Sequence, residues 1–142
     1  MCVVAHLAAQ GPDKGYWQPA SNNAASITGD IAIGNAKLTL NFRSYPLAAI
    51  RSLKPAEVAA VFDADVNTAG QGALYRLRVA AGTKLLHHNT LCGEDDTQWM
   101  ATYLSDPKTL QVAFFSGDDE PVFTMDAISK SSRLCGTFTF VR

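Results

Sequence analysis

The stretch ITGDIAIGNAKLTLNFR, residues 27–43, decides the fold class of this chain. Large apolar residues alternate with polar or small ones on both sides of Gly34-Asn35, a dipeptide that suits a two-residue hairpin turn. A turn there pairs Ile33 with Ala36 and puts the large apolar side chains of both strands on one face. The opposite face then carries Asp30, Lys37, Thr39, Asn41 and Arg43. The pattern predicts a β-hairpin with one buried face.

Three later segments alternate between two faces and are predicted as strands: residues 74–79, 97–104 and 135–141. Residues 109–116 are predicted as a strand because they follow residues 105–108, a candidate type I turn. Helix signals are few. Residues 55–63 fit a helix beginning at Pro55 or, equally, a strand, and Thr124 with Asp126 fits the start of one short helix. We therefore expect a mostly-β, single-domain antiparallel β-barrel or sandwich with one or two short helices.

Composition bounds the function classes. The 142 residues fit one globular domain, with 47% hydrophobic and 18% charged residues. A net charge of −1 argues against nucleic-acid binding. The sequence contains no run of 18 apolar residues, so we predict no membrane span. It also contains no glycine-rich phosphate-binding loop, so we expect no nucleotide and no cofactor.

The N-terminus is apolar over residues 1–9 and polar over the loop-like residues 10–25. This is typical of the end of a secretory leader followed by a linker, although the basic start of a leader is missing. A first strand or an apolar arm on the core is the alternative. We expect residues 1–25 to be a signal-peptide remnant and linker, residues 26–142 to be a disulfide-linked β domain, and the protein to be periplasmic or secreted.

Two of the three cysteines, Cys92 and Cys135, lie in the same tripeptide, LCG. Neither belongs to the CxxC pair that a zinc or thioredoxin-like site needs. A disulfide between them fits an exported chain, and two buried thiols are the alternative. We expect the bridge to anchor the start of the last strand, with Cys2 as the odd cysteine.

Other candidate sites are weaker. Asp63, Asp65 and Asn67 have calcium-loop spacing, but the turn glycine and the final glutamate of an EF-hand are absent. His87 and His88 would point to opposite faces of a strand and cannot readily share a metal.

Arg43, Arg76 and Arg78 lie on outward strand positions and could bind a small anionic ligand. The aromatic residues Tyr16, Trp17 and Trp99 could form a recognition surface or belong to the core. The serines fit no GxSxG nucleophile motif, and we assign no catalytic residue.

The segments ITGDIAI, LTLNF, NTLCG with TQWMATY, LQVAFFSG and LCGTFTFV resemble a group of small exported bacterial proteins of unknown function. The resemblance covers about residues 26–142 and implies export and a disulfide. Periplasmic lysozyme inhibitors are a more distant architectural comparison, as compact antiparallel barrels with a disulfide. Their short recognition motifs are not evident in this chain.

These observations favour an exported binding or inhibitor-type module, whose partner is an unknown protein or a small anionic ligand. The alternative is a small hydrolase whose site the sequence does not reveal.

Overall fold

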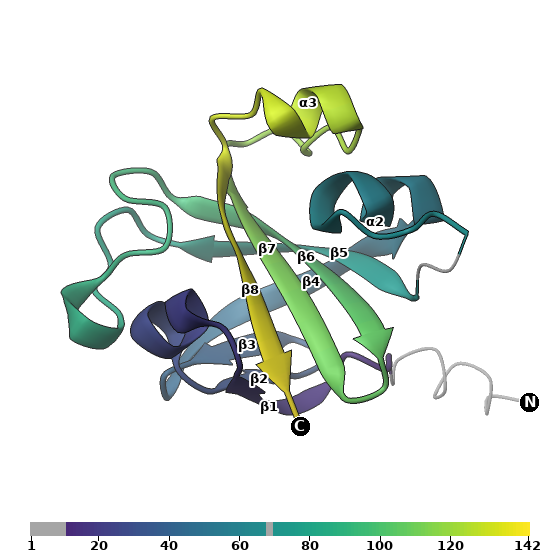
Figure 1. Ribbon diagram of the computed structural model, residues 1–142. Helices are drawn as coiled ribbons and strands as arrows, with labels where there is room; N and C mark the ends of the chain where they lie inside the picture. The colour runs from purple at the N-terminus through teal and green to yellow at the C-terminus, as the bar shows by residue number, and fades with distance from the viewer. Residues whose placement is uncertain (1–10, 68–69) are drawn as a thin grey trace, which may run out of the picture.

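A computed structural model describes residues 11–67 and 70–142 and shows a closed antiparallel β-barrel (Figure 1). Each of the eight strands pairs with its neighbour along the chain, and the last strand pairs with the first. The strands are β1 (Gly15–Pro19), β2 (Ile31–Ile33), β3 (Lys37–Leu40), β4 (Arg43–Leu53), β5 (Gly72–Val79), β6 (Thr97–Asp106), β7 (Thr109–Ser116) and β8 (Leu134–Val141). The helical segments are η1 (Ala24–Thr28), α2 (Pro55–Phe62), η2 (Leu86–His88) and α3 (Met125–Ser129). The predicted mostly-β, single-domain barrel is confirmed.

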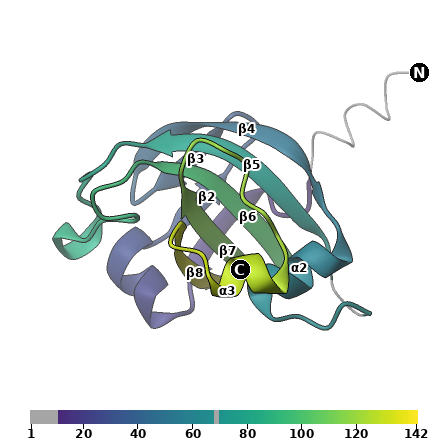
Figure 2. The same cartoon turned by 90° about the horizontal axis from the view of Figure 1, so that it is seen from above.

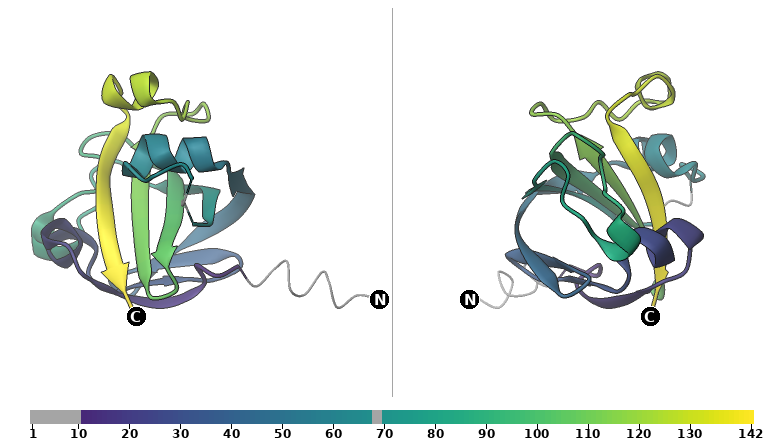
Figure 3. Two further views of the ribbon diagram at one scale, coloured as in Figure 1. Left: turned by 45° about the vertical axis from the view of Figure 1, so that its right-hand side comes forward. Right: turned by 90° about the vertical axis from the view of Figure 1, so that its left-hand side faces the viewer.

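The core lies on both faces of β6 and β7. Met100 and Leu104 point into the barrel, whereas Trp99, Ala101 and Tyr103 point outward, which confirms the predicted alternation. The outward side chains are covered by α2, which lies across β6 and β7 in the left view of Figure 3, and by the segment that leads to α3. Strands buried on both faces lose the apolar-polar alternation, as in the run VAFF of β7.

The predicted hairpin exists as β2 and β3, but its turn is displaced by one residue. The backbone N–H of Gly34 donates to the carbonyl of Lys37 over 2.9 Å, so the turn residues are Asn35 and Ala36. Ile33 consequently pairs with Leu38, two positions from the predicted partner. Because a shift of two residues preserves the side-chain faces, the apolar residues of β2 and β3 are still buried. Phe42, predicted on the same face, instead lies in the turn after β3 and is 92% exposed.

The hairpin was predicted to begin at residue 27, and this start is wrong. Residues 24–28 form η1, a single π-helical turn. The choice between helix and strand after Pro55 is decided by α2, which begins at that residue. The predicted short helix is confirmed by α3, where the hydroxyl of Thr124 accepts from the N–H of Ala127. Figure 2 shows η1 beside the long loop that carries η2 on one side of the barrel, with α2 on the other. No helix in residues 11–67 and 70–142 is long and apolar enough to cross a membrane.

The interpretation of residues 11–25 as a linker is wrong, because β1 lies within them and closes the barrel. Trp17 of β1 is fully buried and pairs with Ile31 of β2. β1 also pairs with β8, so the β domain begins before residue 26. The proposed leader falls on residues 1–10, which lie outside the described residues.

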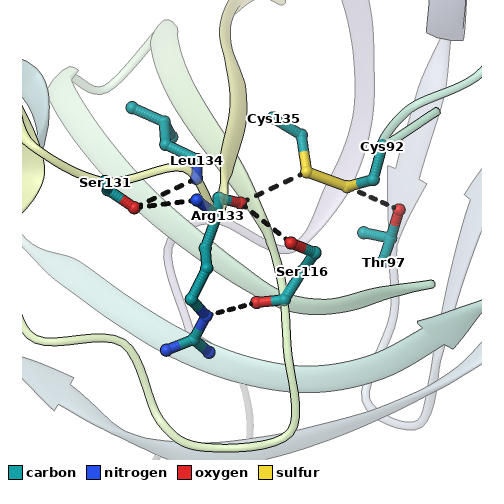
Figure 4. Close-up of a disulfide and its surroundings, with 7 residues drawn as sticks. All are labelled: Cys92, Thr97, Ser116, Ser131, Arg133, Leu134 and Cys135. Atoms are coloured by element: carbon teal, nitrogen blue, oxygen red, sulfur yellow. Dashed lines mark hydrogen bonds between the residues drawn. A yellow bond between two sulfur atoms is a disulfide. The ribbon is translucent and has the colours of Figure 1, made fainter. Parts of the chain in front are cut away.

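The predicted disulfide joins Cys92, in the loop before β6, to Cys135 near the start of β8 (Figure 4). Leu134 pairs with Phe115 and Gly136 with Phe114, so Cys135 is the extra residue of a β-bulge. Regular alternation from Phe138 would place Cys135 on the outer face, and the bulge turns it toward the inner cluster.

Glycine after each cysteine has a backbone reason. Gly93 has φ +64° and Gly136 has φ +154°, backbone conformations that residues other than glycine rarely adopt. Around the bridge, the hydroxyl of Thr97 donates to the Sγ of Cys92, and the guanidinium Nε of Arg133 donates to the carbonyl of Ser116 (Figure 4). The repeated LCG thus coincides with two glycines of positive φ, one in the loop before β6 and one beside the bulge of β8.

Candidate functional site

A pocket of about 840 Å³ opens where β1 begins, β4 and β6 end and β5 starts. Its walls are mostly apolar and come from β4, β5 and β6: Ala49, Ile50, Leu53, Ala73, Leu74 and Leu104. Its volume lies within the range of sites that hold drug-sized molecules. This pocket is the best candidate for a ligand site in the described part of the chain.

Asp13 forms the polar floor of the pocket. Its side chain reaches into the barrel end and is only 3% exposed. The phenol of Tyr75 donates to Asp13 Oδ2 over 2.6 Å, and the hydroxyl of Thr102 donates to the same oxygen over 2.8 Å. Two donors of this kind satisfy a carboxylate that burial would otherwise destabilise.

Lys14 extends this network to the pocket rim. Its ammonium donates to the phenol oxygen of Tyr75 over 3.1 Å and lies 4.6 Å from the centre of the Tyr75 ring. Burial, with the hydrogen bond to Asp13, raises the pKa of the Tyr75 phenol above its ordinary value. Tyr75 therefore keeps its proton, donates it to Asp13 and offers its lone pair to Lys14.

The last residue of the chain fixes the backbone that carries Asp13 and Lys14. The Arg142 guanidinium donates to the carbonyls of Lys14, over 2.9 Å, and Pro12, over 3.0 Å. It also lies 4.0 Å from the centre of a Trp17 ring, and the indole N–H of Trp17 donates to the Asp13 carbonyl. These contacts tie the backbone of Pro12, Asp13 and Lys14 to Trp17 of β1 and to Arg142 after β8.

A second cation, Arg51, lines the pocket but is already paired. It makes two hydrogen bonds to Glu57, at 2.8 and 2.9 Å, and contacts Glu120 at 2.9 Å. The pairing with Glu57 lowers the pKa of that carboxyl and raises the pKa of Arg51. Lys14, in contrast, makes no ion pair within residues 11–67 and 70–142, so its charge is available to a ligand.

β4 carries a bulge at the pocket wall. Its register with β5 shifts between Ala49 and Arg51, which leaves Ile50 as the extra residue. The Ile50 side chain is 44% exposed and lines the pocket. Bulges are common beside binding sites, where they redirect a side chain.

The structure does not bring the three predicted anion-binding arginines together. Arg43 of β4 pairs with Leu40 of β3, whose side chain points into the barrel. Arg76 and Arg78 lie two and four positions after Leu74 on β5, and the side chain of Leu74 points outward. Arg76 lies 4.5 Å from the centre of a Trp99 ring and donates to Gln98. Arg78 forms an ion pair with Asp96 at 2.9 Å.

The calcium-loop candidates Asp63, Asp65 and Asn67 lie exposed between α2 and β5. Asp65 accepts a hydrogen bond from the backbone N–H of Asn67, and Asp63 ends α2 in the left-handed conformation. No cluster of three His, Cys, Asp or Glu side chains suited to a metal ion occurs among the described residues. His87 and His88 are exposed in η2 and do not lie on a strand.

Of the two interpretations left open for the aromatic residues, the core is correct for two of the three. Trp17 is fully buried and Trp99 is 6% exposed, so both belong to the core. Tyr16 is 55% exposed on the outer face of β1. Sequence reasoning missed Asp13, Lys14 and Thr102 as site residues, because the hydrogen bonds that join them span up to 89 positions.

The geometry suits binding better than catalysis. The contact between Thr102 and Asp13 has the form of a hydroxyl nucleophile beside a carboxylate base. Thr102 lines the pocket but has no exposed surface, and its hydroxyl donates to Asp13. What the pocket presents is the ammonium of Lys14 beside an apolar wall.

Comparison with protein-family models, with curated proteins and with solved structures found no match to this chain.

Proposed function

We propose that this protein is a non-catalytic, exported binding module that holds a small molecule with an apolar body and an anionic group. The ammonium of Lys14 at the rim of the barrel-end pocket is the observation that carries the proposal. The Asp13–Tyr75–Thr102 network fixes this ammonium in advance, so binding costs little conformational entropy.

The pocket walls support the choice of ligand. Ala49, Ile50 and Ala73 line the pocket with accessible apolar surface that suits an aliphatic or aromatic body. The negative charge of Asp13 lies behind the Tyr75 phenol, which donates its proton to it. An anionic group at the rim therefore meets Lys14 first.

Export is the second part of the proposal, and the disulfide between Cys92 and Cys135 supports it. Disulfides persist in the periplasm and outside the cell, whereas the cytosol keeps most thiols reduced. An inhibitor of a partner protein and a small hydrolase are the competing functions.

Titration with medium-chain carboxylic acids, and with alcohols of the same chain length, tests the proposal. We expect the acid to bind more tightly than the alcohol, and Lys14→Met to weaken acid binding by about tenfold, or about 1.4 kcal/mol, while leaving alcohol binding unchanged. Lys37→Met is the matched control, because Lys37 lies on β3 and does not line the pocket. Equal loss in both lysine variants, equal affinity for acid and alcohol, or hydrolysis of the corresponding esters would refute the proposal.

A further inference from the structure

The turn between β3 and β4 contains a side chain that the fold does not explain. Its two central residues, Asn41 and Phe42, both have positive φ, at 48° and 70°. Two-residue hairpin turns of this kind favour Asn at the first position and Gly at the second. Phenylalanine is disfavoured in this conformation, because its Cβ crowds the backbone.

Burial does not compensate for the unfavourable conformation of Phe42. The side chain is 92% exposed, so it gains almost nothing from packing on the barrel. A residue that is strained and exposed is neither a good turn former nor part of the core. Backbone strain of this kind is concentrated at functional sites.

Phe42 has an aromatic neighbour across the outer face of the sheet. Tyr16 of β1 pairs with Ala32 of β2, which pairs with Thr39 of β3, so these three side chains form a row on that face. A cleft of about 110 Å³ lies along the row, lined by Tyr16 at one side and Phe42 at the other. Both rings are available to a ligand, because Tyr16 is 55% exposed.

Asp30 gives this cleft its charge. It is the only charged side chain among the described residues that line the cleft. Its Oδ2 accepts the phenol proton of Tyr16, and this hydrogen bond raises the pKa of Tyr16. The hydrogen bond orients both the carboxylate and the Tyr16 ring toward the same space.

We propose that Tyr16, Phe42 and Asp30 form a site for one lysine or arginine side chain of a partner protein. Aromatic faces attract organic cations, and a carboxylate neutralises their charge. The cleft is smaller than the pocket at the barrel end and suits the end of one side chain. Lys37 lies two positions from Thr39 on β3 and disfavours a second basic residue beside the bound one, so the bound cation has neutral or acidic neighbours.

The site does not depend on the function proposed for the barrel-end pocket. Its side chains lie on the outer face of β1–β3 and on the β3–β4 turn, and it shares no lining residue with that pocket. The Lys14→Met variant should therefore bind a basic side chain as the unchanged protein does.

The test uses two-dimensional NMR titration of the full chain with Nα-acetyl-lysine methylamide, which keeps its ε-ammonium charge, and with its uncharged analogue Nα-acetyl-norleucine methylamide. We expect the lysine probe to shift resonances of Tyr16, Asp30 and Phe42, and the norleucine probe to bind at least tenfold more weakly. Asp30→Asn should weaken lysine binding by about tenfold while keeping a hydrogen-bond acceptor for Tyr16.

Phe42→Gly separates a binding role from a structural one. Glycine suits the turn, so we expect this variant to unfold at the same temperature as the unchanged protein or higher, and to lose lysine binding at least tenfold. Destabilisation by Phe42→Gly would assign Phe42 to the fold and overturn the proposal. Equal binding of the lysine and norleucine probes, preferential binding of a neutral sugar, or no shift with any probe would also overturn it.

Discussion

Replacing Cys92 and Cys135 by serine should destabilise the protein by about 4 kcal/mol. The two cysteines are 43 positions apart, and cross-linking a loop of about that length lowers the entropy of the unfolded chain by this amount at 25 °C. With a slope of about 2 kcal/mol per M urea, the unfolding midpoint should fall by roughly 2 M. A domain with a typical stability of about 5–15 kcal/mol remains folded at room temperature after this loss.

The structure also predicts where the double variant loosens first. β8 pairs with β7 from Leu134 to Val141, and this ladder does not need the bridge. The loop over residues 80–96 has no ladder and is held by the bridge, by buried Leu85 and Leu91, and by a few backbone hydrogen bonds. The loop should therefore open before the C-terminal strand, in contrast to what the sequence alone suggests.

Urea denaturation checks the predicted loss of stability, and native-state hydrogen exchange checks which segment opens first. The amides of Gly82 and Leu85, which donate to Gly93 and Asn89, should lose protection first. Before reduction, alkylation of the unchanged protein should label at most one thiol, that of Cys2. Destabilisation below about 1 kcal/mol, or loss of protection in β8 while the loop stays protected, would refute this reasoning.

Two further predictions concern ion pairs and the Arg142 contacts. Glu57→Gln should cost roughly 0.5–1 kcal/mol at neutral pH, measured by urea denaturation. The hydrogen bond from Arg51 lowers the pKa of Glu57 in the folded protein. The stabilisation by Glu57 is therefore complete above its ordinary pKa of 4.5 and disappears as the pH falls through the lower pKa of the folded state. A stability difference between Glu57→Gln and the unchanged protein that persists at lower pH would contradict this prediction. Arg142→Met should cost about 1–2 kcal/mol by loss of its hydrogen bonds and of its stacking on Trp17, and should expose amides near residue 14 to exchange. An equal destabilisation by Arg43→Met would show that removal of a positive charge, and not loss of the Arg142 contacts, lowers the stability.

Local patterns were sufficient to predict most of the barrel. β5 and β8 were predicted because large apolar residues alternate with other residues along them, and β6 and β7 because segments of strand length flank a candidate turn at residues 105–108. β4 was missed because few of its side chains are buried, and because Pro46 and several polar residues interrupt its pattern. β1 was missed because its single buried side chain, Trp17, stands between exposed neighbours in a segment rich in glycine and proline. β4 pairs with its sequence neighbours β3 and β5, and β1 pairs with β2 and with β8 at the other end of the chain, so pairing that neither segment contains specifies both strands.

The candidate site was less predictable than the fold. Tyr75 was correctly expected on the inner face of its strand, but nothing near it in sequence indicates its contact with Asp13, 62 positions away. Asp13 follows a Gly-Pro pair, which is the usual composition of an exposed turn. Its burial depends on Thr102 and Arg142, which become neighbours only when the barrel closes.

The location of the pocket follows from how the barrel closes. β1 and β8 share ladder pairs only at residues 18–19 of β1, so the segment before β1 has no strand partner at the barrel end. Arg142 holds this segment through backbone carbonyls, and a segment held in this way is free to bend inward. It does so at Asp13, whose carboxylate reaches the Tyr75 phenol and leaves Lys14 at the rim. The short seam that closes the sheet thus creates the opening that a ligand can enter.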